Sequence, residues 1–284
     1  MSASAESDVA HLRELGYEDP QESAAKRAAA ERCLDEQLVE ARVRLESGDL
    51  AAAIDQLEGL AAASPEWAAP RASLARAYLQ AGRFGAAEQC LAWLETHGIE
   101  HPQFSLMRAT IAAAQRRFNA AMDEAEYARS MNNALPAAEV LLGEIHLRCG
   151  RLNAAAEAFE RALAVRADDA GALVGLANVS LRRGDDDRAI DLALQALDVT
   201  LEWPAAHLCL GLALARIERP ADAVTALETF VKLAPCRAAA AARLMARICE
   251  GAGDVAQAAA RRERSRKLVR ERRVQRARDS CVKT

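Results

Sequence analysis

Small residues recur along this chain with a period of 34 residues, and that period dominates its pattern of hydrophobic and polar positions. The segment ESGDLAAAI contains Gly48, and similar segments follow at Gly82, Gly150 and Gly184. These glycines lie 34, 68 and 34 residues apart. A repeat of this length is typical of stacked two-helix units, in which each unit is one supersecondary element.

Three further turns complete the series. Two fall on Arg116 and Glu218, and the last comes one residue late at Gly253. Seven residues before each turn the chain has Ala41, Ala75, Ala109, Gly143, Ala177, Gly211 and Ala246. Five residues after it stand Ala53, Ala87, Ala121, Ala155, Ala189, Ala223 and Ala258. Because all fourteen positions carry Ala or Gly, the repeat includes a steric requirement as well as a turn.

Helix packing explains that requirement. Two antiparallel helices approach to about 8 Å only when small side chains lie at their contact, and a turn glycine supplies the left-handed conformation that ends the first helix. Larger residues such as Leu57, Phe159 and Leu227 then fill the space between hairpins. The high Ala content and the 4% aromatic content also favour helices over strands. The sequence therefore predicts an all-α protein.

The repeat resembles the tetratricopeptide repeat (TPR) over about residues 34–272. Leu142, Gly143, Gly150, Ala155 and Phe159 match the family pattern best, within the repeat 136–169. The resemblance implies a right-handed superhelical solenoid of about seven helical hairpins with a long C-terminal capping helix. The large aromatic expected early in the first helix is absent, and Arg71, Leu173 and His207 occupy those places.

The predicted organisation has three parts. Residues 1–21 form an acidic leader with one short helix at Val9–Leu15, and residues 22–260 form the solenoid. Its repeats are expected at 34–67, 68–101, 102–135, 136–169, 170–203, 204–237 and 239–272. A helix is expected to begin near Glu22, and the last helix to run to about Arg278. Residues 261–284 form a basic helix and tail.

The polar N-terminus lacks the basic start and apolar run of a signal peptide, and no stretch approaches the roughly 18 apolar residues that span a bilayer. Seven scattered cysteines form no CxxC pair and predict neither a disulfide framework nor a zinc site. A cytoplasmic location is expected. Arg outnumbers Lys 33 to 4, which hints at a GC-rich bacterial genome.

The charge of the last segment differs from the rest of the chain. Residues 261–284 hold eleven basic and three acidic residues, whereas the other 260 residues carry a net charge of −12. The candidate contact residues of this basic helix are Arg261, Arg262, Arg264, Arg266, Lys267 and Arg270. The favoured explanation is that a terminal repeat needs a polar outer face. The next is that the helix contacts an acidic partner or the acidic body of its own chain. Nucleic acid and membranes are less favoured, because no aromatic residue is present to stack on bases.

In the TPR family the first helix of each hairpin lines a concave groove that holds a peptide. The resemblance places Arg42, Arg76, Thr110, Glu144, Asn178, Leu212 and Arg247 in that groove. Arg148, Arg182 and Arg216 repeat at 34-residue intervals along one edge. We predict that the groove receives an acidic segment, with Arg76, Arg148, Arg182 and Arg216 contributing most, because guanidinium groups pair with carboxylates. Their alternative role is to complement the dipole at a helix C-terminus.

A clamp for the acidic C-terminus of heat-shock chaperones is not predicted, because Val174 and Cys209 stand where that TPR subfamily needs Lys and Asn. His97 and His101 have the spacing of two metal ligands, but Gly98 and Pro102 interrupt the helix there. His146 and His207 fall at packing positions and are expected to be satisfied core histidines. The cluster Asp185–Asp187 at a turn is expected to be solvated.

No catalytic motif is present, and neither a cofactor nor a small-molecule substrate is expected. The sequence predicts a non-catalytic scaffold or adaptor for a protein or peptide. Two alternatives remain open. Residues 11–20, HLRELGYEDP, resemble the end of catalytic domains in bacterial alkaline-phosphatase or sulfatase-like proteins, which would make the chain the accessory arm of a hydrolase. Self-assembly through an end repeat, giving a homodimer, is the other.

Overall fold

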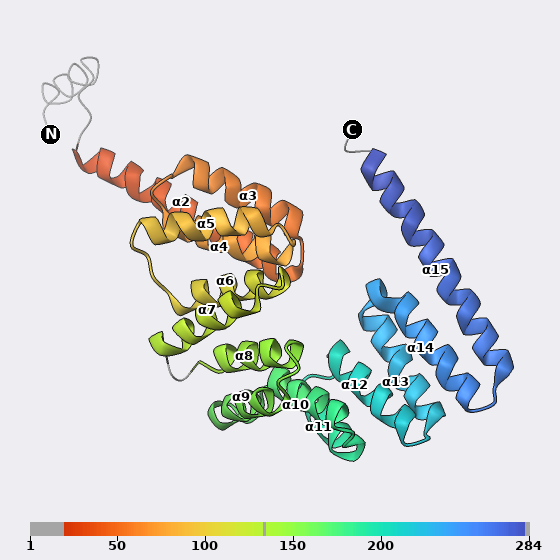
Figure 1. Cartoon of the computed structure of the whole chain (residues 1–284). Helices are drawn as coiled ribbons and strands as arrows, with labels where there is room; N and C mark the ends of the chain where they lie inside the picture. Colours follow the sequence, from red (N-terminus) through yellow and green to blue (C-terminus); the bar gives the residue numbers. More distant parts are fainter. Residues whose placement is uncertain (1–19, 133–134, 282–284) are drawn as a thin grey trace, which may run out of the picture. The chain divides into compact units, whose positions relative to one another are not determined.

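The chain is all-helical over residues 20–132 and 135–281, the parts that the structure, a computed structural model, describes (Figure 1). Side chains are described within residues 32–132 and 135–271. Fourteen α-helices and one short 3₁₀ turn occupy these ranges, and no strand occurs in them. The prediction of an all-α fold built from helical hairpins is confirmed.

Two compact units divide the chain between Ile111 and Ala112. The first unit contains two antiparallel hairpins. They are formed by α2 (Pro20–Ser47) with α3 (Leu50–Ala63), and by α4 (Ala68–Gln80) with α5 (Phe84–Thr96). The boundary between the units lies within α6 (Pro102–Ala114).

The second unit contains α7 (Phe118–Met131) and four hairpins. These pair α8 (Pro136–Arg148) with α9 (Leu152–Val165), α10 (Ala170–Arg183) with α11 (Asp186–Val199), α12 (Pro204–Arg216) with α13 (Pro220–Leu233), and α14 (Ala238–Gly251) with α15 (Val255–Cys281). The 3₁₀ turn Pro235–Arg237 leads into α14. Each second helix also packs on the next first helix, so the hairpins stack in chain order within the unit.

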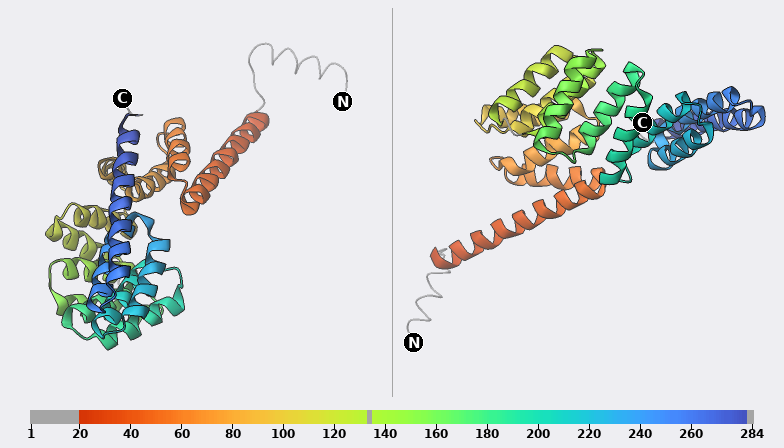
Figure 2. Two further views of the ribbon diagram at one scale, coloured as in Figure 1. Left: turned by 90° about the vertical axis from the view of Figure 1, so that its right-hand side faces the viewer. Right: turned by 90° about the horizontal axis from the view of Figure 1, so that it is seen from below.

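The first and last helices are about twice as long as the others. Helix α2 begins at Pro20, close to the predicted start at Glu22, and α15 ends at Cys281, close to the predicted end at Arg278. Figure 2 shows each of them extending beyond its hairpin partner. The leader up to residue 19, including the helix predicted at Val9–Leu15, and residues 282–284 lie outside the described part of the chain.

The hairpin turns adopt the left-handed backbone conformation that the repeat predicts. Gly184 has φ of 82° and caps α10, and the other turn glycines have similar positive values. Arg116 and Glu218 stand where two repeats lack glycine, and they adopt the same conformation with φ of 64° and 59°. The turn geometry is therefore kept where the residue type no longer favours it.

All fourteen small-residue positions are buried. The tightest packing surrounds Phe159 of α9, which is fully buried. Its ring lies against Gly143 of α8 on one side and Gly175 of α10 on the other, where an added Cβ would come within 2.6 and 2.3 Å of ring atoms. One large side chain thus fills the space between two successive first helices.

Candidate functional site

A hollow of about 800 Å³ lies between α12 and α14, two successive first helices of the second unit. Arg216 and Arg247, both predicted groove residues, line it together. Glu218 and the apolar residues Leu244 and Ile248 also line it, and these three were not among the predicted groove residues. The hollow therefore combines two cations and one carboxylate with apolar side chains, a combination suited to a polypeptide segment rather than to a small ion.

The arginines at 34-residue intervals form a ladder that links successive repeats. Arg148 donates from Nη1 to the main-chain carbonyl of Ala113, at 3.2 Å, and Arg182 donates to the carbonyl of Leu147, at 2.7 Å. Arg216 donates in the same way to Leu181. Each acceptor lies 35 residues before its donor, near the C-terminal end of the preceding first helix. Each of these carbonyls also accepts a backbone N–H from the turn that follows its helix, so the arginine adds a second, inter-repeat hydrogen bond to the same oxygen.

This contact also fixes the direction of each guanidinium. A guanidinium has five N–H donors, and the carbonyl takes one of them, while all three arginines stay exposed to solvent. Arg216 uses a further contact, since its Nη1 lies 3.1 Å from Oδ1 of Asp186. The ladder therefore supports the stack and still presents oriented donors at its surface.

Two other predicted groove residues of the second unit, Asn178 and Glu144, interact with groups of their own helices, whereas Leu212 packs against the apolar cluster of α10, α11 and α12. Asn178 donates to the carbonyl of Val174 at 3.0 Å. Glu144 is exposed, yet desolvation by the surrounding helices raises the pKa of its carboxyl group, and Arg148 partly opposes that shift. An acidic group at this position would repel an acidic ligand, so the negative charge of Glu144 opposes the predicted preference locally.

Three predicted groove residues lie in the first unit and are described there. Arg42 donates from Nε to Oγ of the buried Ser73, at 3.1 Å, and so ties α2 to α4. Arg76 lies 3.9 Å from a carboxylate oxygen of Glu46, and Thr110 donates to the carbonyl of Leu106. Arg42 and Arg76 thus contact the neighbouring hairpin or first helix, as the ladder arginines do.

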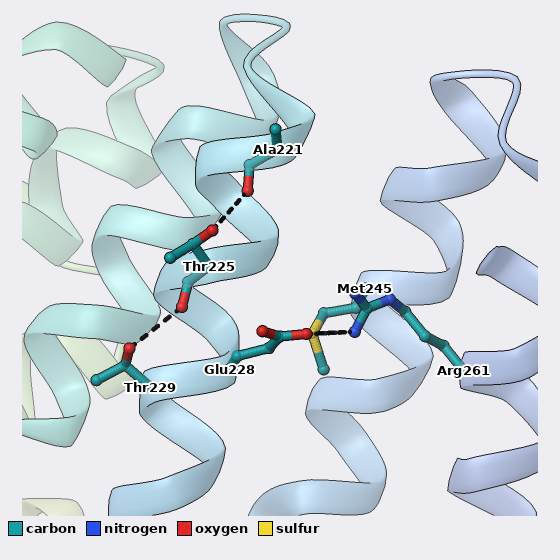
Figure 3. A network of polar contacts seen from close by, with 6 residues as sticks. All are labelled: Ala221, Thr225, Glu228, Thr229, Met245 and Arg261. Atoms are coloured by element: carbon teal, nitrogen blue, oxygen red, sulfur yellow. Dashed lines mark hydrogen bonds and ion pairs between the residues drawn. The ribbon is translucent and has the colours of Figure 1, made fainter.

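The basic C-terminal helix is attached to its neighbours by its first two arginines. Arg261 extends from α15 to Glu228 of α13, with Nη1 3.0 Å from Oε1, and it also contacts Sδ of Met245 on α14 (Figure 3). Arg262 forms an ion pair with Glu250. These two side chains hold α15 against the last repeats, as expected of a capping helix.

Beyond this point α15 is fixed by a buried serine. Ser265 donates to the carbonyl of Ala239 at 2.9 Å. Arg266 and Lys267 contact Glu263 and Glu271 of their own helix, at 3.4 and 4.0 Å, while Arg264 and Arg270 are exposed. The capping interpretation accounts for Arg261 and Arg262, and it leaves most of the remaining basic residues facing solvent.

The histidines differ from one another. His97 stacks on Trp93 with ring centroids 3.7 Å apart, and His101 accepts a hydrogen bond from the backbone N–H of Gln103. His207 is buried and lies 3.1 Å from the carbonyl of Leu201, so it is satisfied as predicted. The same prediction was wrong for His146. Its Nδ1 is buried without a hydrogen-bond partner, and desolvation lowers the pKa of its ring.

In the aspartate cluster at the turn before α11, Asp185 and Asp187 are exposed as expected, whereas Asp186 is partly buried. Asp185 caps the helix by accepting from the backbone N–H of Arg188, and Asp186 pairs with Arg216 of the next repeat.

Among the residues whose side chains are described, no group of three or more His, Cys, Asp or Glu residues could hold a metal ion. None of the helices in the described ranges is long and apolar enough to cross a membrane.

Comparison with protein families identifies the repeat. A tetratricopeptide-repeat model matches residues 72–136, 140–201 and 208–267, and a second such model matches residues 44–97. These matches cover well over half of the chain. The chain belongs to the tetratricopeptide-repeat family. No curated protein sequence matches this TPR protein.

Solved structures share its fold at low sequence identity. A tetratricopeptide repeat protein from Parabacteroides merdae ATCC 43184 matches with a TM-score of 0.60 and 14% identity, over 84% of this chain and 93% of that one. The APC/C hetero-tetramer Cut9–Hcn1 matches with a TM-score of 0.67 and 15% identity, over 76% of this chain and 42% of that chain. TTC0263, a thermophilic TPR protein from Thermus thermophilus, gives 0.52 and 20%, over 63% and 97%. At these identities the likeness concerns the fold alone.

Proposed function

We propose that this TPR protein is a non-catalytic scaffold that holds a segment of another protein along the first helices of its second unit. The observation that carries the proposal is the hollow between α12 and α14, in which Arg216 and Arg247 flank apolar side chains. One of the structural relatives, Cut9–Hcn1, is by its description a hetero-tetramer. Assembly with other proteins is the general use of this fold, and we extend it to this chain.

The proposed ligand is an acidic segment. Arg148, Arg182 and Arg216 are held in place by their carbonyl contacts, so less side-chain entropy is lost when a carboxylate binds to the remaining donors. Arg247 forms no ion pair within the described residues and is available for a carboxylate. We place the segment along this edge, with its apolar side chains in the hollow. The role as an arm of a hydrolase stays a prediction, as does the cytoplasmic location.

A random peptide library displayed on phage tests the proposal when it is selected against the immobilised full chain. Peptides enriched in Asp and Glu are expected, and a fluorescein-labelled copy of the dominant sequence gives Kd by anisotropy. Arg247→Glu should weaken binding by about tenfold or more, because it replaces attraction with repulsion at a site without a structural contact. Arg264→Glu makes the same charge change on α15 away from the hollow and is the control.

Two outcomes would overturn the acidic-segment proposal. One is a selected set without an excess of acidic residues, and the other is equal Kd for wild type and Arg247→Glu. Arg182→Lys adds a check on orientation. It keeps the charge but loses the planar fork, so binding should weaken although the overall charge is unchanged.

A further inference from the structure

A second groove, of about 830 Å³, lies between α14 and α15 of the last hairpin. Its lining includes Arg243, Arg247, Arg262, Arg266 and Arg270, and no acidic residue. Two of these arginines are paired outside the groove lining, Arg262 with Glu250 and Arg266 with Glu263. The other three form no ion pair with any residue that the structure describes. The groove is therefore strongly cationic.

The repeat frame shows what this groove corresponds to elsewhere in the chain. Thirty-five residues before Arg243, Arg262 and Arg266 stand Leu208, Leu227 and Val231. Those three side chains belong to the apolar cluster in which hairpin α12/α13 packs against α14. The matching face of an internal hairpin is thus where the first helix of the next repeat docks. In the last hairpin, arginines replace the apolar side chains of that face.

The first hairpin of the chain shows the complementary change. On α2, Val39 and Val43 are 58% and 59% exposed, and Glu36 is exposed beside them. Their equivalents in α12 are Ala206, Cys209 and Ala213, which are all buried in the cluster formed with α10 and α11. In later repeats this face of the first helix therefore packs on the preceding hairpin, and in α2 it carries an acidic residue where α12 has alanine.

We propose that α2 of one copy of this protein docks into the α14/α15 groove of a second copy, as the first helix of a following repeat would. Glu36 then faces the arginines of the groove, and Val39 and Val43 cover Leu244 and Val269 at its base. Compared with hairpin α12/α13, each of these two faces thus has a charged residue in place of a small or apolar one, and the two charges are opposite. A simple polar cap accounts for neither the single sign of charge in the groove nor the exposed valines.

Such an interface is heterologous, since two different surfaces meet. After the first contact the pair of copies still has one free α2 and one free groove, so association continues into a closed ring or an open filament. Because the attraction is largely electrostatic, assembly should weaken as salt rises. The inference does not require the peptide-binding function proposed above. The two hollows share Leu244 and Arg247, but Glu36 and Arg266, the residues changed in the test below, do not line the hollow between α12 and α14.

Sedimentation velocity of the full chain across a range of protein concentrations tests the inference at low salt. Wild type is expected to form species larger than a monomer, while Glu36→Arg and Arg266→Glu should each weaken association by about tenfold or more. Mixing these two variants should restore a heterodimer, because the native α2 face of Arg266→Glu fits the native groove of Glu36→Arg. That complementation distinguishes a head-to-tail interface from a symmetric one.

Two matched variants make the same charge changes at exposed positions outside both faces. Asp55→Arg lies on α3 and Arg264→Glu lies on α15, and neither should alter association. Circular dichroism should show that all four variants keep the helical content of wild type. A wild-type monomer at every concentration at low salt would overturn the inference. So would association that survives either charge reversal, or variants that fail to complement each other.

Discussion

Phe159 and Gly175 pack so closely that a Cβ atom added at position 175 would come within 2.3 Å of the ring, the shortest such distance among the described glycines. Gly175 does not belong to the repeating set of small residues, since it lies nine residues before its turn rather than seven. It is small because Phe159 is large. This one pair shows how a single aromatic side chain sets the spacing of α8, α9 and α10.

Gly175→Ala should therefore destabilise the protein by roughly 1–3 kcal/mol, the usual cost of overpacking a core. The ring is fully buried, and the same ring atoms also lie close to Gly143 of α8, so a shift away from position 175 is restricted. Gly59→Ala on α3 is the matched control, because an added Cβ there meets no atom within 4 Å. It should stabilise the helix by about 0.5–1 kcal/mol. Urea unfolding of the two variants measures both effects, and a Gly175→Ala variant as stable as wild type, or more stable, would contradict the packing argument.

The repeat period was enough to predict the helices, their turns and the fourteen buried small residues. It was also enough to align Arg148, Arg182 and Arg216, because residues one period apart occupy the same place in successive hairpins. Their acceptors could not be predicted from it. A main-chain carbonyl at the end of the preceding helix has no residue type that marks it in the sequence.

The remaining failures arise from side chains whose environment depends on a neighbouring repeat. Asp186 was expected to be solvated, yet Arg216 of the next repeat pairs with it. The ring of His146 was expected to have its hydrogen bonds satisfied, yet its buried Nδ1 has no hydrogen-bond partner. In the hollow between α12 and α14, Arg216 and Arg247 were identified from their register, whereas Leu244 carries no signal that separates it from a core leucine. The sequence predicts which residues occupy equivalent positions in successive repeats, but not which atoms contact one another between those repeats.

The turn at Glu218 gives a second prediction. A residue with a Cβ in the left-handed region costs about 1–2 kcal/mol, and glycine avoids that cost while losing about 0.5–1 kcal/mol through its greater freedom when unfolded. Glu218→Gly should therefore raise the free energy of unfolding by up to about 1 kcal/mol, and the same holds for Arg116→Gly. Differential scanning calorimetry would show the corresponding rise in Tm.

Two variants control for the side chain itself. Glu218→Ala removes the carboxylate but keeps the Cβ, so it should not reproduce the gain. Gly184→Ala introduces a Cβ at a turn with φ of 82° and should lower stability by about 1 kcal/mol. If Glu218→Ala stabilised the protein as much as Glu218→Gly, the backbone conformation would not be the cause.

The carboxyl group of Glu144 gives a prediction about pH. Its pKa is raised mainly by desolvation, so the folded protein binds the proton more tightly than the unfolded chain. Stability then falls as pH rises from the unfolded value, near 4.3, through the folded pKa, and the full cost is present at neutral pH. Glu144→Gln removes the charge and should raise Tm at pH 7, with a gain that shrinks towards zero as pH falls below about 4. Glu157→Gln, an exposed position on α9, is the control for the change of side chain. A gain in Tm that stayed constant down to acidic pH would show that the charge of Glu144 is not its source.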